Sequence, residues 1–527
     1  MISKIKRFLL SVFFFQASFW ASSLLLAEGA EEARYTIARI EVSVAGRSRK
    51  DAILRAGGFI TGEELSGKNA LDKYIAEKSR VLMNRRELEE VVIDCQIDGV
   101  EEGAFEVTLF VNVKDTRNFI ILPEPKYSSN SGFEPAIKIR DYNFLGAMMP
   151  LKIDLGYKLD EFHLDDVSKS KYSLVLETDI PVRISRLHGI FSFAAELGYV
   201  AGERPLFSNR SGVSFDIPVN TRVLKKAFLT FGFEQGAFLG EEYYSFEKAL
   251  HDKIFENIVY MYSKPFAGFK LPFGVFIPVF DGWFWNAAVS LKAPYRLSGD
   301  CLLWRNGPVI ALSDSISYSR VNWRGNFRDG EAASVTLSDE YNIYFDEWNN
   351  RLIAEGILHR RFADFAGFSI RGRVAYWFNS AEHYRDIERL EAASVLRGLL
   401  DRSLTANAML SINFDIPFRV LRFLPSEWFD APKLRYFNFE LHISPMLDLA
   451  VVDGSLLDSA GARRETLSFK MNDLLAAFGV EVLVFPLAWR SIFLRLSAGW
   501  NLRELCERGV LPSGADREIY IGLGHHY

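Results

Sequence analysis

The chain has few cysteines, no excess of basic residues and no second long apolar run. Its three cysteines, Cys95, Cys301 and Cys506, lie far apart in 527 residues. They form neither a Cys-x-x-Cys pair nor a disulfide framework, so we expect three unpaired thiols. The net charge of −5 argues against a nucleic-acid partner, because no basic excess is present to neutralise phosphates.

Signatures of common enzymes are also missing. The chain contains no Gly-x-Ser-x-Gly, His-Glu-x-x-His, P-loop or Gly-x-Gly-x-x-Gly pattern before a helix. Its histidines show no metal-ligand spacing except for the adjacent pair His525 and His526, which would point to opposite faces of a strand. We therefore expect no enzyme activity, no catalytic residue, no metal and no cofactor.

The N-terminus has the pattern of a secretory signal. Lys4, Lys6 and Arg7 precede an apolar run over 8–26, and Ala27-Glu28-Gly29-Ala30 follows it. A charged start, an apolar middle and a small-residue end predict a signal peptide at residues 1–29. The alternative is an uncleaved membrane anchor, since the run approaches spanning length. Gln16 and several serines interrupt the run and favour export.

A small α/β domain is expected at residues 34–117. The hydrophobic spacing predicts one strand, two helices and two strands, at residues 35–44, 50–56, 69–84, 90–97 and 105–113. That order is sufficient for one small core, with the helices on one face of a mixed sheet.

The remainder of the chain, residues 123–527, has the alternation of β-strands. The clearest segment, 151–159, has apolar residues at every odd position. Roughly sixteen such segments of about ten residues fit the length of tilted transmembrane strands. The others are 133–141, 171–180, 188–199, 211–219, 226–236, 283–292, 308–318, 333–345, 351–360, 367–378, 406–416, 436–450, 474–486, 492–500 and 519–523.

Two architectures fit this alternation, a membrane barrel and a soluble array of β-sandwiches. Alternation alone does not distinguish inward from outward positions. The signal peptide, the 14% aromatic content and polar strand residues such as Lys152, Asp154, Lys158 and Arg495 favour the barrel. In lipid every backbone group must pair internally, which requires closure. The expected fold is mainly β, a transmembrane antiparallel barrel of about sixteen strands preceded by one small α/β domain.

Four features occur in order along the chain. They are the small α/β domain, an Asn-x-x-Gly turn at 143–146, the tetrapeptide Leu396-Arg397-Gly398-Leu399 before an alternating strand, and Met446-Leu447-Asp448-Leu449-Ala450. Together they resemble the BamA/TamA-type outer-membrane assembly superfamily over nearly the whole mature chain. There they correspond to a POTRA domain, the turn after the first barrel strand, the Val-Arg-Gly-Phe/Tyr loop motif and the Phe-x-Asp-x-Gly strand motif.

The chain departs from that family in several places. Leu399 replaces an aromatic residue, and Met446 and Ala450 replace Phe and Gly. Only one POTRA domain is expected, whereas assembly members usually carry several. Two-partner secretion transporters usually carry two domains and a preceding plug helix, so that subfamily is disfavoured.

The resemblance implies a role for the tetrapeptide. In the family the loop folds back into the barrel, and its arginine pairs with the acid of the later strand. We therefore expect the Arg397 guanidinium to be held bidentately by Asp448. The alternative is an exposed loop arginine with a solvated neighbour.

The resemblance also directs attention to the seam between the first and last barrel strands. The expected first strand, 133–141, contains Pro135, which cannot donate a ladder hydrogen bond, and the last strand contains Gly522 and Gly524. A client strand could pair with the opened edge; the alternative is simply short terminal strands. Tyr520, Gly522 and Tyr527 resemble the C-terminal signal of outer-membrane barrels.

These observations predict an outer-membrane barrel with one POTRA domain in the periplasm. The resemblance implies that it aids insertion, assembly or translocation of outer-membrane proteins. The expected partners are outer-membrane lipids, client outer-membrane or exported proteins, and periplasmic accessory proteins that bind the POTRA domain. The alternatives are a passive pore, a lipid-transport or structural barrel of the same fold, and a two-partner-secretion-like transporter.

Overall fold

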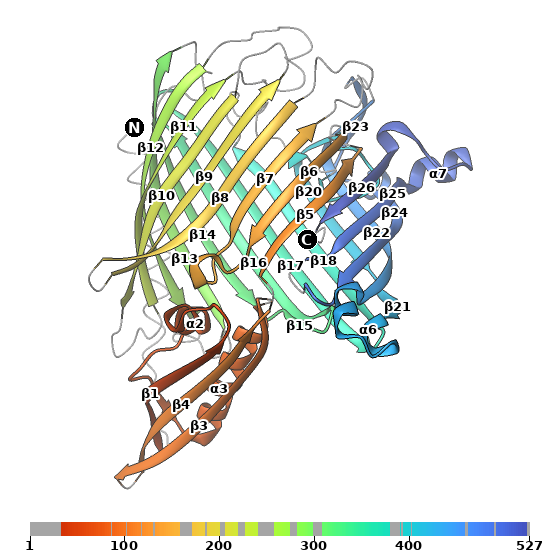
Figure 1. The fold of residues 1–527 in the computed structure, drawn as a ribbon. Coiled ribbons are helices and arrows are strands. Elements are labelled where there is room, and N and C mark those ends of the chain that lie inside the picture. Colours follow the sequence, from red (N-terminus) through yellow and green to blue (C-terminus); the bar gives the residue numbers. More distant parts are fainter. Residues whose placement is uncertain are drawn as a thin grey trace.

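The computed structural model describes a small N-terminal domain and a large barrel (Figure 1). It covers residues 33–523 apart from 86, 102, 117, 130–131, 159–170, 185–186, 201–205, 220–226, 241–257, 274–281, 299–307, 380–389, 392–393, 402, 459–461 and 490–491. The expected signal peptide at 1–29, Gly524 and Tyr527 lie outside the described residues.

The N-terminal domain is a small mixed α/β sheet, as expected from its sequence. Its strands are arranged in the order β2-β1-β4-β3, with β1 parallel to β4. The sheet and its two helices enclose the domain's apolar core. The elements are β1 Arg34–Ala45, α2 Lys50–Gly57, β2 Glu64–Ser66, α3 Lys68–Met83, β3 Leu88–Glu101 and β4 Ala104–Asp115. The three-residue strand β2 is too short to give a periodic signal. No helix in the described part of the chain is long and apolar enough to cross a membrane.

The second unit is a closed antiparallel barrel of 18 strands. Its long strands are β5 Phe119–Ser128, β6 Gly132–Asp141, β7 Leu151–Lys158, β8 Lys171–Ile184, β9 Leu187–Val200, β10 Leu206–Val219, β11 Ala227–Gly240, β12 Ile258–Pro272, β13 Trp283–Ser298, β14 Val309–Ser319, β16 Phe327–Asn342, β17 Glu347–Ala363, β18 Ala366–Asn379, β20 Leu404–Asp415, β22 Phe439–Leu457, β24 Leu475–Pro486, β25 Leu494–Asn501 and β26 Arg517–Leu523.

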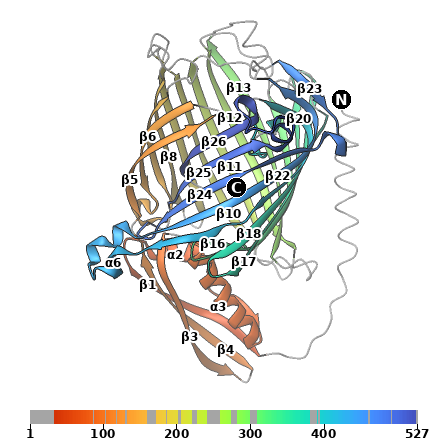
Figure 2. The same cartoon turned by 90° about the vertical axis from the view of Figure 1, so that its right-hand side faces the viewer.

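Short strands and helices lie in the connections between these long strands. They are η1 Phe144–Gly146, β15 Asn322–Arg324, β19 Leu390–Glu391, β21 Phe418–Phe423, α6 Pro425–Trp428, η8 Pro432–Phe437, β23 Arg463–Leu467, η9 Met471–Asp473, α7 Leu502–Arg508 and η10 Gly514–Asp516. The barrel end that faces the N-terminal domain is called the domain-side rim, and the other end the opposite rim (Figures 1 and 2).

The expected count of about sixteen strands is wrong, because β5 and β12 were missed. Strand β5 carries Pro123 and Pro125, which interrupt the pattern of a central strand. Strand β12 carries Pro265 and begins with five consecutive residues that are apolar or aromatic on both faces, Ile258 to Tyr262. Neither strand therefore alternates clearly, although both pair along their length in the barrel.

The direction of the alternation in the barrel favours a membrane barrel over a soluble sandwich. In β20 the polar side chains of Ser411, Asn413 and Asp415 are buried, whereas Leu410 and Ile412 are exposed on the outer face. A soluble sandwich would bury the apolar set instead. Polar residues toward the lumen and apolar residues outward are the arrangement of transmembrane β-barrels.

Candidate functional site

The loop between β18 and β20 folds into the barrel and buries Arg397, which is only 2% exposed. The guanidinium donates to both carboxylate oxygens of Asp448, from Nη2 at 2.6 Å and from Nε at 2.9 Å. Its Nη1 donates to Asp415 Oδ1 at 2.8 Å, and the Arg397 backbone N–H donates to Asp448 Oδ2 at 2.8 Å. The expected bidentate pair is therefore present, and the alternative of an exposed arginine is wrong.

The two acids reach the arginine because of strand register. Asp448 lies on the lumenal face of β22 and is paired directly with Asn413 of β20. Asp415 follows two residues later on the same face of β20. Asn413 Nδ2 donates to the Val395 carbonyl at 2.6 Å, so β20 also holds the loop backbone. The sequence reasoning missed Asp415 and Asn413, although both occupy one face of the strand that follows the tetrapeptide.

Two glycines let the loop backbone lie directly on the barrel wall. Gly398 has φ +119°, and a Cβ there would lie 2.8 Å from the Ala477 Cβ and 2.9 Å from the Trp500 nitrogen. A Cβ on Gly499 in β25 would lie 2.9 Å from the Gly398 nitrogen. Gly499 was not identified from the sequence, since only the folded path of the loop brings Gly398 beside it. The loop thus requires glycine on both sides of this contact.

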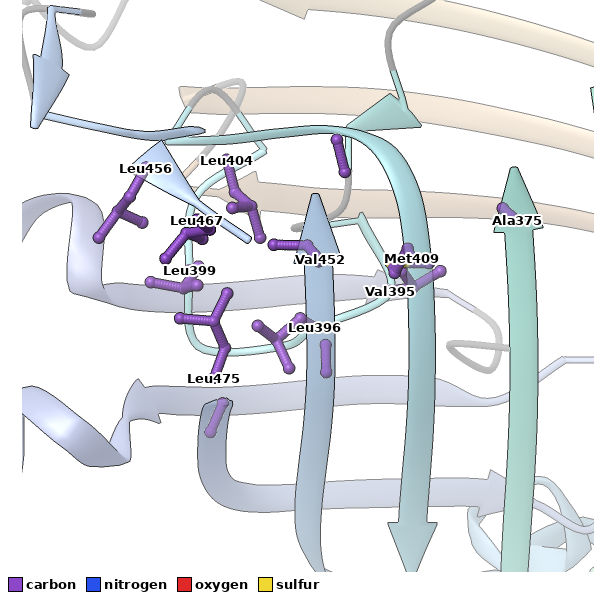
Figure 3. Close-up of a cluster of buried hydrophobic side chains, with 13 residues drawn as sticks. Ala375, Val395, Leu396, Leu399, Leu404, Met409, Val452, Leu456, Leu467 and Leu475 are labelled. Atoms are coloured by element: carbon purple, nitrogen blue, oxygen red, sulfur yellow. The ribbon is translucent and has the colours of Figure 1, made fainter. Parts of the chain in front are cut away.

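Apolar side chains surround the rest of the loop (Figure 3). Leu396 and Leu399 are fully buried in a cluster formed by the loop and by β18, β20, β22, β23 and β24. Its members are Ala375, Val395, Leu396, Leu399, Leu404, Ala406, Met409, Ala450, Val452, Leu456, Leu467, Leu475 and Ala477. Leu399, which replaces the family's aromatic residue, therefore has a packed aliphatic environment. The loop is fixed by apolar packing as well as by its ion pairs.

The lumenal charges continue toward the last strand. Arg495 of β25 donates to Glu481 of β24 at 2.6 Å, and both side chains are buried. The Arg495 guanidinium also lies 4.8 Å from the ring centroid of Tyr520 in β26. A Cβ on Gly522 would collide with the Tyr520 ring, so this glycine makes room for the stacked pair. Among the described residues, no three His, Cys, Asp or Glu side chains are grouped as metal ligands.

The barrel closes at a short seam between β26 and β5. Within the described residues the register contains two pairs, Tyr520 with Ser128 and Ile521 with Tyr127. Ser129 N–H adds a bond to the Ile519 carbonyl at 2.9 Å. By contrast, β25 and β26 pair continuously from Arg517 to Leu523. The seam is therefore held by fewer backbone bonds than its neighbour.

Prolines in β5 remove ladder donors next to the paired part of the seam. Extending the observed register places Pro125 opposite Leu523, where the proline has no N–H to donate. The Leu523 N–H bonds instead to the carboxylate of Glu124 at 3.1 Å. The expected first strand, 133–141, is wrong, because it corresponds to the second strand, β6. Pro135 lies there, paired with Pro125 rather than with the last strand.

The Asn-x-x-Gly turn after β6 joins the barrel to the N-terminal domain. Asn143 Nδ2 donates to Ser48 Oγ at 2.8 Å, and Asn143 Oδ1 accepts from the Met148 N–H at 2.9 Å. Asp115, at the end of β4, accepts from the backbone N–H of Ser48 at 2.8 Å and from Arg47 N–H at 2.7 Å. One polar cluster therefore connects the turn, the β1–α2 connection and the end of β4.

The same turn is packed into the domain. Met148 is buried among the apolar side chains of the domain core. The Gly146 carbonyl accepts from Arg49 N–H at 2.8 Å, and Gly146 has φ +69° with no room for a Cβ beside the Arg47 carbonyl. Arg55 Nη2 donates to the Ala147 carbonyl at 3.0 Å, and burial lowers the pKa of this arginine. The turn is thus a docking element rather than an exposed loop.

A second contact joins the domain to the hairpin that precedes β16. Asn322 Oδ1, in β15, accepts from Arg80 at 2.9 Å and from Asn84 Nδ2 at 3.0 Å, at the end of α3. The Trp323 N–H donates to Asn84 Oδ1 at 3.3 Å. The domain therefore contacts the domain-side rim at two separate places, the β6–β7 turn and this hairpin.

The hairpin also contacts strands farther round the barrel, β22 and β24. Asn326 Nδ2 donates to Glu440 of β22 at 2.8 Å, and the Phe327 ring stacks on His442 at a centroid distance of 4.7 Å. Trp323 packs against an apolar cluster formed by Leu483 and Phe485 of β24 and by Phe493 just before β25. The hairpin thus spans part of the lumen near the domain-side rim.

No family model matches the chain, and the comparison with curated proteins gives no match. Solved structures with a similar barrel include BamA from Haemophilus ducreyi lacking POTRA domains 1–3, at 13% identity and TM-score 0.36, covering 93% of this chain and 85% of that chain. CdiB from Acinetobacter baumannii has 11% identity and TM-score 0.45, with 93% and 73% covered. CdiB from Escherichia coli has 12% identity and TM-score 0.40, with 99% and 97% covered. At these identities the likeness concerns the fold alone.

Proposed function

We propose that this protein inserts proteins into the outer membrane or translocates them across it, by opening the seam between β5 and β26. The observation that carries the proposal is the seam itself, where the described residues form two register pairs and β5 carries two prolines. A client strand would pair with the exposed edge of β26, in the manner of β-strand addition. No cofactor or nucleotide enters this cycle.

Among the described residues, opening the seam breaks fewer backbone bonds than opening a full ladder between two long strands. Each backbone hydrogen bond has a net worth of about 0.5–1.5 kcal/mol, so separating the few seam bonds costs on the order of a few kcal/mol. The β16–β17 pair, with its register from Gly330 to Asn342, would cost several times more. An incoming strand with regular backbone N–H groups offsets this cost and supplies donors that Pro123 and Pro125 lack.

The Arg397 loop supports the side of the seam that has to stay in place. It binds β20 and β22 through Asp415 and Asp448, and its Gly398 lies on Gly499 of β25. The Leu400 N–H donates to the Ala515 carbonyl just before β26, at 3.1 Å. The strands from β20 to β26 are therefore braced as one wall, so that β5 and β6 would move relative to it.

The N-terminal domain is placed to transmit a signal to the moving side. Its polar cluster around Asn143 and Asp115 holds the β6–β7 turn, one strand from the seam. We propose that this domain acts as a POTRA domain in the periplasm, where accessory proteins or clients pair with its edge strand β3. A force on the domain would then be transmitted through the β6–β7 turn to β6.

The proposal is tested by depleting the protein from cells and taking a census of outer-membrane proteins and lipids. Loss of several barrels, or failure to export a specific client, supports insertion or translocation. An altered lipid composition with normal protein levels would contradict the proposal and favour lipid transport. No change in either would favour a passive pore or a structural barrel.

A further inference from the structure

The segment between β21 and β22, residues 424–438, leaves the barrel wall and protrudes outward at the domain-side rim (Figure 2). It contains helix α6 Pro425–Trp428 and the 3-10 helix η8 Pro432–Phe437. Asp430 between them has φ +46° and turns the chain back toward the barrel. We call this segment the rim platform.

The rim platform is an ordered unit held at its base. Ser426 N–H donates to Asn438 Oδ1 at 3.3 Å, and Asn438 Nδ2 donates to Ser426 Oγ at 2.7 Å. The Tyr436 ring stacks on Trp489 of the β24–β25 connection at a centroid distance of 5.9 Å. The Leu487 N–H bonds to the Asn438 carbonyl at 2.9 Å. The side chains of the platform are therefore presented in a defined direction.

Three large aromatic side chains of the platform face outward. Trp428 is 58% exposed, Phe429 70% and Phe437 65%. Burying a side chain of this size contributes about 1.5–3 kcal/mol, so an ordered platform that exposes three of them loses a large stabilisation in water. Exposed apolar patches of this kind mark interaction sites.

The apolar surface continues from the platform onto the outer face of the barrel. Phe365, in the β17–β18 turn, accepts from the Arg419 N–H of β21 at 2.7 Å, and its ring is exposed. Phe362, Val420 and Leu421 beside it are exposed as well. Because the outer face of the barrel contacts lipid, the platform lies at the edge of the same bilayer.

Basic side chains of the platform and of the adjoining end of β21 lie within reach of lipid headgroups. Lys433 and Arg435 of the platform are exposed, as are its acids Glu427 and Asp430. Arg422, at the end of β21, is exposed as well and lies 3.5 Å from Glu440. Tryptophan together with basic residues is the composition that proteins place at the membrane–water interface. An amphipathic segment lying in the plane of the interface buries its apolar side chains among the headgroups and upper acyl chains.

We propose that the rim platform is an interfacial anchor, which inserts Trp428, Phe429 and Phe437 into the leaflet on the side of the N-terminal domain and binds anionic headgroups. The anchor would fix the depth of the barrel on the side of β21 and β22. This inference requires only that the barrel spans a membrane, and it does not depend on the proposed role in insertion or translocation.

The test places a fluorescent label on the platform in the full-length protein. Cys95, Cys301 and Cys506 are replaced by serine, Phe429→Cys is labelled with an environment-sensitive dye, and the protein is reconstituted into vesicles. The control label is placed at Val92→Cys, an exposed position on β3 of the N-terminal domain. Heat-dependent migration in gels checks that both variants contain a folded barrel.

Lipids with a nitroxide near the headgroup should quench the label at 429 several-fold more strongly than the label at 92, and aqueous iodide should do the reverse. Equal access of iodide to both labels would overturn the proposal. That result is also the one expected if the platform binds a protein partner, because the vesicles contain no such partner to cover it. Adding phosphatidylglycerol should increase the lipid quenching at 429, and Lys433→Gln with Arg435→Gln should abolish that increase. An unchanged increase in this variant would overturn the headgroup assignment.

Discussion

The ion pairs of Arg397 with Asp448 and Asp415 form what we call the lumenal clamp. The substitution Arg397→Ala tests how much this clamp contributes to the free energy of unfolding. The side chain makes three hydrogen bonds to Asp448 and Asp415, and all three groups are buried in the barrel. Its removal leaves two carboxylates without their cation. Breaking a buried ion pair by removing one partner costs about 3–5 kcal/mol. The Arg397 backbone N–H keeps its bond to Asp448 and offsets part of that cost.

The assay is urea unfolding of the barrel in lipid vesicles, followed by tryptophan fluorescence, together with limited proteolysis of the loop at 394–401. Arg397→Ala should lower the free energy of unfolding by about 3–5 kcal/mol and expose the loop to protease. Arg397→Lys keeps the charge but loses the planar fork, so it should be intermediate.

The matched control is Arg503→Ala in α7, whose pairs with Glu465 and Glu507 are largely exposed. Exposed pairs contribute about 0–1 kcal/mol, so this variant should remain close to the wild type. A stability of Arg397→Ala equal to that of the control, with the loop still protected, would refute the clamp.

Three further predictions follow from single contacts. Gly499→Ala should displace the loop and make it sensitive to protease, because the new Cβ would lie 2.9 Å from the Gly398 nitrogen. Gly372→Ala is the control: its Cβ would have no atom within 4 Å, so the loop should stay protected. Asn143→Ala leaves the Met148 N–H without its acceptor and should cost about 1–3 kcal/mol; faster proteolytic release of the N-terminal domain would reveal it. Pro125→Val adds a ladder donor opposite Leu523 and should slow client insertion or export in cells, and unchanged rates would contradict the seam geometry.

Much of the barrel was predictable because lipid and lumen impose opposite polarity on alternate positions of a strand. The expected strand at 151–159 shows this alternation in sequence, and its described part forms β7, Leu151–Lys158. Strands β5 and β12 escaped because prolines and aromatic residues on both faces remove the alternation. Which face is inward cannot be read from alternation, and it became clear only when Asp415 and Asn413 were found buried.

The site was predictable only in part. The pairing of Arg397 with Asp448 followed from the family resemblance and from the need of a buried cation for an acid. The contact of Gly398 with Gly499 could not be predicted, because it joins residues a hundred positions apart through the path of one loop. The sequence pattern puts the seam one strand too late, because it assigns Pro135 to the first strand, whereas Pro135 lies in the second strand, β6.

The central claim is that the seam opens, and a disulfide across it is the most direct test. In a chain whose native cysteines are replaced by serine, Tyr127→Cys with Ile521→Cys links directly opposed residues of β5 and β26. Tyr127→Cys with Phe133→Cys links β5 to β6 and leaves the seam free. Both variants are expressed in cells depleted of the native protein, and client levels in the outer membrane are measured with and without reductant. If the seam opens during function, the seam-locked variant should fold but leave client levels low, and reductant should restore those levels. The β5–β6 variant should support normal client levels throughout. Normal client levels with the seam locked would contradict seam opening.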